Sequence, residues 1–86
     1  MHYVYVLQNK KEYEDLYFWC TGDLKKRLKE HNDGKSRATI GKQWELPYYE
    51  AYSSATDAWN REKQLKYHGQ AKGQLKRRIT NSLSKS

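Results

Sequence analysis

The chain is short and strongly basic. It has 86 residues, with 17 lysines and arginines against 10 acidic residues, and a formal net charge of +7. A chain of this length buries roughly 60% of the surface that its unfolded form exposes, so it supports one small domain and leaves no room for a second. A single cysteine, Cys20, excludes an intramolecular disulfide, and no apolar run approaches the roughly 20 residues of a membrane-spanning helix.

The positive charge is concentrated in the C-terminal third. Residues 1–60 carry nine basic and nine acidic side chains, whereas residues 61–86 carry eight basic side chains and one acidic one. This distribution suits a polyanionic partner, most simply nucleic acid, because each phosphate that is neutralised releases condensed counterions. A basic surface that only keeps the protein in solution would have the same composition.

The first half of the chain predicts a hairpin followed by a helix. Residues 2–8 and 15–21 are rich in β-branched and aromatic types and are separated by polar residues, which indicates two antiparallel strands. The sequence Thr21-Gly22-Asp23 then opens a helix with an acid in its first turn, and Asn32-Asp33-Gly34 ends it. The composition of residues 35–43 predicts a basic, irregular loop.

The middle of the chain predicts a third strand and a second helix. Residues 45–53 have strand composition, but Pro47 lacks an N–H group, so we expect the strand to begin at about Tyr48. Ser54-x-x-Asp57 resembles a capping box and predicts a helix that runs to about Tyr67.

Residues 70–83 predict a last helix, with Leu75, Ile79 and Leu83 facing inward. The order β-β-α-β-α-α indicates an α+β fold, in which a small three-stranded antiparallel sheet is flanked by helices. We expect a single domain over residues 1–83 and a frayed tail over residues 84–86.

Glu62 is an acid on a helix face that would otherwise be apolar. It shares that face with Ala58 and Leu65, and a carboxylate directed inward needs a partner. The candidate partners are a metal ion and the side chains of Tyr5, Tyr17, Arg27 and His31. These are components of a site that cleaves phosphodiester bonds, although a buried acid satisfied only by Arg27 or by tyrosine hydroxyls would have a purely structural role.

Several segments in order carry a resemblance to a known family. They are Tyr3-Val4-Tyr5, Leu16-Tyr17-Phe18-Trp19-Cys20-Thr21, and residues 23–32, 44–52 and 61–66. On these segments the chain resembles the GIY-YIG nuclease superfamily, in particular its compact single-domain members. The resemblance implies an endonuclease that hydrolyses phosphodiester bonds of DNA with a divalent metal ion, in repair, recombination or a mobile element.

The resemblance also implies roles for five residues. Tyr5 corresponds to the general base, Tyr17 to a residue that orients water or phosphate, and His31 to a proton-relay partner. Arg27 would pair with the scissile phosphate, and Glu62 would bind the metal, Mg²⁺ or Mn²⁺. A single carboxylate suits Mg²⁺, which keeps several waters. In the structural alternative, Tyr5 and Tyr17 are a cross-strand aromatic pair, and Arg27 and His31 lie on a solvated helix face.

Trp19 departs from the family pattern, because the second triplet should end in glycine. On an alternating strand Trp19 points to the same side as Tyr17, where it either obstructs the phosphate or stacks on a base. A catalytically inactive nucleic-acid-binding module, with Trp19 filling the cleft, is therefore the alternative function. An engineered or protein-interaction variant of the fold is a third reading, suggested by Trp44 and Trp59.

The predicted DNA contacts are basic residues of the loop and of the last helix. They are Lys35, Arg37, Lys72, Lys76, Arg77 and Arg78. We expect DNA as the partner, with branched and nicked forms among the candidates, no membrane, and either a monomer or a weak homodimer that works alone or with a protein partner. The N-terminal residues lack the features of an export signal, so we expect a cytoplasmic location.

Overall fold

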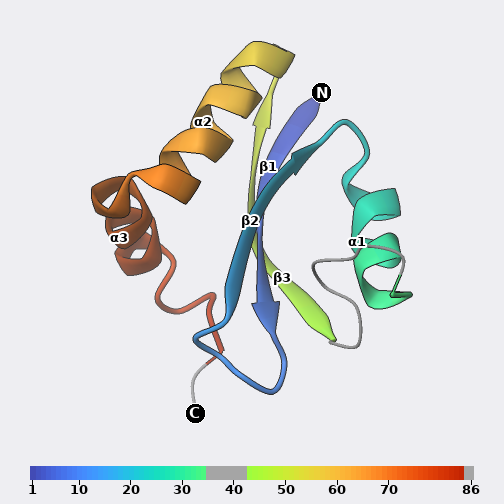
Figure 1. Ribbon diagram of the computed structural model, residues 1–86, viewed down its shortest axis with the longest axis vertical. Helices are drawn as coiled ribbons and strands as arrows, with labels where there is room; N and C mark the ends of the chain where they lie inside the picture. Colours follow the sequence, from blue (N-terminus) through green and yellow to red (C-terminus); the bar gives the residue numbers. More distant parts are fainter. Residues whose placement is uncertain (35–42, 85–86) are drawn as a thin grey trace.

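The computed structural model describes residues 1–34 and 43–84 and confirms the expected α+β fold. Within these residues, β1 (His2–Asn9), β2 (Leu16–Thr21) and β3 (Trp44–Tyr52) form an antiparallel sheet in the order β2-β1-β3. Helix α1 (Leu24–Asn32) lies on one face of the sheet, and α2 (Ala55–Tyr67) and α3 (Gly69–Arg78) lie on the other (Figure 1). No helix in the described part of the chain is both long and apolar enough to cross a membrane.

The central strand β1 contributes to two hydrophobic clusters, one on each face of the sheet. Val4 and Val6 pack with side chains of α2 and α3, among them Leu65 and Leu75. Tyr5 and Leu7 point to the other face, toward α1. Because both faces are covered, nearly all side chains of β1 are buried. They alternate between the two faces and so connect the two helical layers.

The expected start of the third strand was wrong. Strand β3 begins at Trp44, before Pro47, and not at Tyr48. The strand pairs only with β1, and its register shifts so that Val6 faces Tyr48 whereas Gln8 faces Glu45. This shift places one extra residue on β3, and an irregularity of this kind on an edge strand accommodates a proline, which cannot donate a ladder hydrogen bond.

The starts of α1 and α2 follow from side-chain caps. Asp23 caps α1 by accepting a hydrogen bond from the Lys26 amide at 3.1 Å, so this acid precedes the first turn instead of lying within it. Ser54 caps α2 through a bond from the Asp57 amide at 3.3 Å, as the sequence predicts. Helix α2 ends at Tyr67, also as predicted.

Helix α3 is shorter than the sequence predicts. It ends at Arg78, and Leu83 still packs against the core from the irregular segment that follows. The buried side chain of Gln8 explains why this segment stays against the sheet. Gln8 donates to the Ser84 carbonyl at 3.1 Å and accepts from the Ser84 amide at 2.8 Å. These two bonds hold Ser84 against β1, while residues 85–86 lie outside the described residues, so the frayed tail stays a prediction.

Candidate functional site

The centre of the candidate site is Tyr5, which is completely buried between the sheet and α1. Its hydroxyl forms a hydrogen bond of 2.8 Å with Nε2 of His31, which is also completely buried. His31 is therefore no part of a solvated helix face. The cross-strand neighbour of Tyr5 is Trp19, whereas Tyr17 lies opposite Leu7. Tyr5 and Tyr17, which the structural alternative treats as a cross-strand aromatic pair, are therefore diagonal neighbours on the two strands.

Both members of the Tyr5–His31 pair are electrically neutral at neutral pH. Burial raises the pKa of Tyr5 to about 12, although the Arg27 guanidinium opposes this shift. Burial also lowers the pKa of His31 below its ordinary value, and the positive charge of Arg27 lowers it further. The hydrogen bond between them therefore joins two neutral groups, and which of them donates depends on the tautomer of His31.

Arg27 lies one helical turn before His31 and is only partly covered. Its side chain is 26% exposed and lies 3.7 Å from the Glu30 carboxylate. Because its charge acts on both Tyr5 and His31, the structure brings these three predicted residues together at one place. Arg27 is the member of this group that faces solvent, which is where a phosphate can reach a guanidinium.

Glu62 approaches the same region from the opposite side of the sheet. Helix α2 packs against β1 and β2, and the Glu62 side chain is 13% exposed. Burial raises the pKa of Cys20 on β2 to about 11, and the adjacent Glu62 carboxylate contributes to this rise. The negative charge of Glu62 also acts on Tyr5. Glu62 and the Tyr5 group are thus within electrostatic reach of each other.

The ion-pair partner of Glu62 is Lys66, which is not among the predicted partners. The Lys66 ammonium lies 3.3 Å from the Glu62 carboxylate, one turn later on α2. The same ammonium lies 3.9 Å from the centre of the Trp19 ring. Trp19 and Tyr17 have ring centroids 5.6 Å apart on one side of β2, which confirms that both side chains share a face. The spacing of Glu62 and Lys66, four residues apart on a helix, is the signal that could have identified this pair.

Glu62 is the residue that the sequence predicts as the metal ligand. The described residues contain no group of three or more His, Cys, Asp or Glu side chains that could surround a metal. A single, partly exposed carboxylate is nevertheless sufficient for Mg²⁺, whose remaining ligands are usually waters and substrate oxygens. Lys66 would have to release part of the carboxylate to such an ion.

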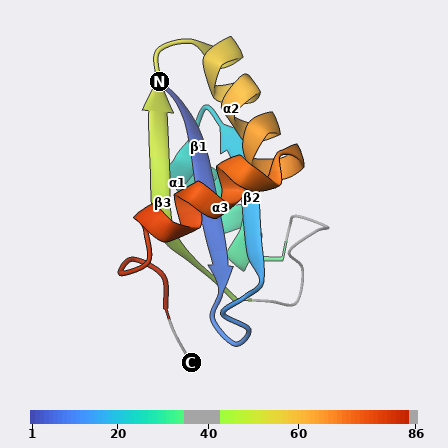
Figure 2. The ribbon, with the colours of Figure 1, turned by 90° about the vertical axis from the view of Figure 1, so that its left-hand side faces the viewer.

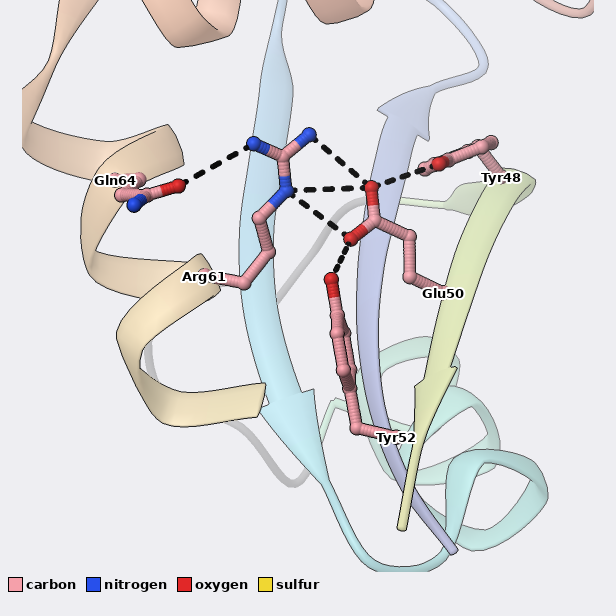
Figure 3. Close-up of polar contacts among 5 residues, drawn as sticks. All are labelled: Tyr48, Glu50, Tyr52, Arg61 and Gln64. Carbon is pink, nitrogen blue, oxygen red and sulfur yellow. Dashed lines mark hydrogen bonds and ion pairs between the residues drawn. The ribbon is translucent and has the colours of Figure 1, made fainter. Parts of the chain in front are cut away.

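A second polar cluster, missed in the sequence, fixes α2 on the sheet (Figure 3). The Glu50 carboxylate on β3 accepts hydrogen bonds from the Tyr48 hydroxyl at 2.7 Å, from Tyr52, and from Arg61 at 3.1 and 3.2 Å. Burial alone would raise the pKa of Glu50, but these donors hold it below its ordinary value. Since Arg61 immediately precedes Glu62, this cluster positions the predicted metal ligand. The alternation Tyr48-x-Glu50-x-Tyr52 places three polar groups on one strand face and is the sequence signal for it.

The predicted DNA contacts are more dispersed than the sequence suggests. Lys35 and Arg37 lie outside the described residues. Helix α3 runs across the strands (Figure 2). Lys72 lies near β2, with its ammonium 5.3 Å from the Phe18 ring centre, whereas the charge of Arg78 acts on Tyr48 of β3.

Lys76 and Arg77 border a groove of about 450 Å³ together with Tyr13 and Leu16, at the end of the first hairpin. A different groove, of about 470 Å³ between α1 and β3, is bordered by Tyr3 and contains none of the five predicted catalytic residues. Lys72 therefore lies beside β2, whereas Lys76 and Arg77 lie near the hairpin end, beside Gln8 of β1 and Leu16 of β2.

Comparison with known proteins identifies the family. The GIY-YIG catalytic domain matches residues 1–77. The chain therefore belongs to the GIY-YIG family of nucleases, a membership that implies a DNA substrate. It is also similar to the UPF0213 protein CPE1444 of Clostridium perfringens, with 38% identity over 68 residues, which are 77% of this chain and 71% of that protein. No solved structure gives a significant match.

Proposed function

We propose that this protein is a DNA endonuclease that hydrolyses phosphodiester bonds with the help of Mg²⁺ or Mn²⁺. The observation that carries the proposal is the hydrogen bond of 2.8 Å between the buried Tyr5 and His31, with Arg27 one helical turn before His31 and Glu62 on the helix that packs against β1 and β2. Carboxylate, guanidinium and phenol groups within electrostatic reach of one another are the groups that hydrolysis of a phosphodiester requires.

In this proposal the three partly exposed residues Glu62, Arg27 and Tyr17 bind the metal ion, the phosphate and the attacking water. Glu62 holds the metal ion, which when bound supplies positive charge to stabilise the developing charge of the reaction. The Arg27 guanidinium pairs with a phosphate oxygen through charge-assisted hydrogen bonds. The hydroxyl of Tyr17, which lies on the same face of the sheet as Tyr5, orients the attacking water.

The buried pair of Tyr5 and His31 accepts the proton of that water. As the Tyr5 oxygen takes the proton, its own proton passes along the existing hydrogen bond of 2.8 Å to Nε2 of His31, a step for which neutral His31 carries its proton on Nδ1. A tyrosine with a pKa of about 12 is a poor base alone, and the imidazole removes the need for a free phenolate. Because Tyr5 has no exposed surface, side chains that pack against its cluster, such as Trp19 and Tyr17, must move to admit the water.

The test compares cleavage of supercoiled and branched DNA by the wild type and by Glu62→Gln, with Mg²⁺, with Mn²⁺ and with a chelator. We expect metal-dependent nicking that decreases at least about 100-fold in Glu62→Gln, as expected for loss of a charge-stabilising group. Glu12→Gln is the matched control, because Glu12 is an exposed acid in the hairpin loop. Nicking that is equally fast in Glu62→Gln contradicts the proposed site.

A second candidate function is binding of nucleic acid without cleavage. It is favoured by Trp19, which occupies the position of the family's glycine, and by the Lys66 ammonium that lies between this ring and Glu62. Trp19→Gly separates the two candidates. Cleavage that appears only in Trp19→Gly shows an intact site blocked by the indole, whereas DNA binding without cleavage in either protein supports the binding module.

A further inference from the structure

The outer edge of β2 is a charged and aromatic surface that extends beyond the residues assigned to the hydrolysis. Within the described residues β2 pairs only with β1, so its other edge is open. Beside it lies a groove of about 210 Å³. The groove is lined by side chains of β2 and by two lysines from the helices: Leu16, Tyr17, Phe18, Trp19, Lys66 and Lys72.

Both lysines of this groove are held close to aromatic rings. The Lys66 ammonium lies 3.9 Å from the centre of the Trp19 ring, and that of Lys72 lies 5.3 Å from the Phe18 ring. Leu16 also lines the neighbouring groove that contains Lys76, so the two grooves adjoin. The basic side chains Lys66, Lys72 and Lys76 therefore form a row that starts beside Trp19 and ends near the first hairpin.

We propose that this row binds an unpaired DNA strand, with one base stacked on Trp19 and its phosphates on Lys66 and Lys72. The inference rests on the proposed endonuclease function, and it defines the substrate as DNA that is single-stranded on one side of the cut. Aromatic rings interleaved with cations are the usual features of surfaces that bind single strands.

The dimensions favour an unpaired strand over a duplex. The groove is smaller than the roughly 300–1,000 Å³ of sites that enclose a ligand, so a base lies on it instead of entering it. Only an unpaired strand can offer the face of a base to Trp19, because in a duplex each face is covered by its neighbours. As the base covers the indole, the Lys66 ammonium moves from the ring to the phosphate.

The test measures the affinity for a 12-nucleotide single strand that contains the fluorescent base 2-aminopurine, and for the corresponding duplex, with a chelator present to prevent cleavage. We expect the wild type to quench the fluorescent base and to prefer the single strand. Trp19→Ala should lose the quenching and weaken binding roughly 5- to 100-fold, whereas Trp19→Phe should keep most of both. Lys72→Gln should reduce the slope of log affinity against log salt by about 0.7.

A second tryptophan–lysine pair on α2 provides the matched control. The Lys63 ammonium lies 3.5 Å from the centre of the Trp59 ring, and Trp59 is 51% exposed and outside the groove. Trp59→Ala and Lys63→Gln should leave quenching and affinity unchanged. If Trp19→Ala and Lys72→Gln match these controls while the wild type cleaves DNA, the inference is wrong and the nuclease proposal stands. If the wild type neither binds nor cleaves any DNA, both fail.

Discussion

At the scale of single residues, Glu50 and Arg61 form the most highly connected ion pair of the described residues. Their side chains are 15% and 23% exposed, and Arg61 contacts both carboxylate oxygens. A pair of this kind contributes little when compared with apolar packing, but removal of one partner leaves the other charge partly buried. A single substitution at either residue should therefore lower the free energy of unfolding by more than the intact pair contributes to it.

We predict that Glu50→Gln and Arg61→Met each lower the free energy of unfolding by about 2–3 kcal/mol, somewhat less than for a fully buried pair because both side chains retain exposure. The double variant should lower the free energy of unfolding by much less than the sum of the two single effects. Urea unfolding measures all three values. Glu30→Gln, which breaks the more exposed pair with Arg27, should cost only about 0–1 kcal/mol. Additive costs of the two substitutions contradict the prediction.

The surroundings of Glu62 illustrate what the sequence could and could not reveal at this scale. The helical period places Glu62 on the face of Ala58 and Leu65, which are both buried, and the residues that the family resemblance groups, Tyr5, Arg27 and His31, lie close together, while their catalytic roles stay predictions. The Lys66 contact was missed, because periodicity alone indicates which residues share a face but not which long side chain bends toward which neighbour.

At the scale of elements, Ser54 determines where α2 begins and thereby where Glu62 lies along β2. We predict that Ser54→Ala costs about 1 kcal/mol of stability, because the Asp57 amide loses its acceptor, and that Ser54→Gly costs only a few tenths. The adjacent and exposed Ser53 provides the control, since Ser53→Ala should have almost no effect. Thermal or urea unfolding of the three variants measures the difference, and equal values for Ser53→Ala and Ser54→Ala contradict the capping role.

The elements that the sequence predicted well are those with local signals. The hairpin, α1 and α2 have strong periodicity or side-chain caps, and their ends agree with the structure within about one residue. The start of β3 and the path of the segment after α3 depend on contacts with distant residues. An irregular register against β1 accommodates Pro47, and Gln8 binds Ser84 from 76 positions away. Such contacts leave no local pattern.

At the scale of the whole molecule, the pH range of stability is set by groups buried on both faces of the sheet. On the acid side, burial lowers the pKa of His31 below 6.5, so the unfolded chain takes up a proton first and stability falls as the pH drops below about 6.5. Glu50, with a folded pKa below 4.5, adds a further loss at lower pH. The free energy of unfolding, measured with urea, should therefore decrease as the pH is lowered from 7 to 3.

On the alkaline side, burial raises the pKa values of Tyr5, Tyr48 and Tyr52 from 10 to about 12. The unfolded chain then loses these protons first, so stability present below pH 10 should decline between pH 10 and 12. Absorbance of tyrosinate at 295 nm provides a direct measurement. In concentrated denaturant all eight tyrosines should ionise together near pH 10, whereas in the folded protein three of them should remain protonated until the chain unfolds. Complete ionisation near pH 10 with the fold intact would show that water reaches Tyr5 freely, and the movement of Trp19 and Tyr17 required for catalysis would then be unnecessary.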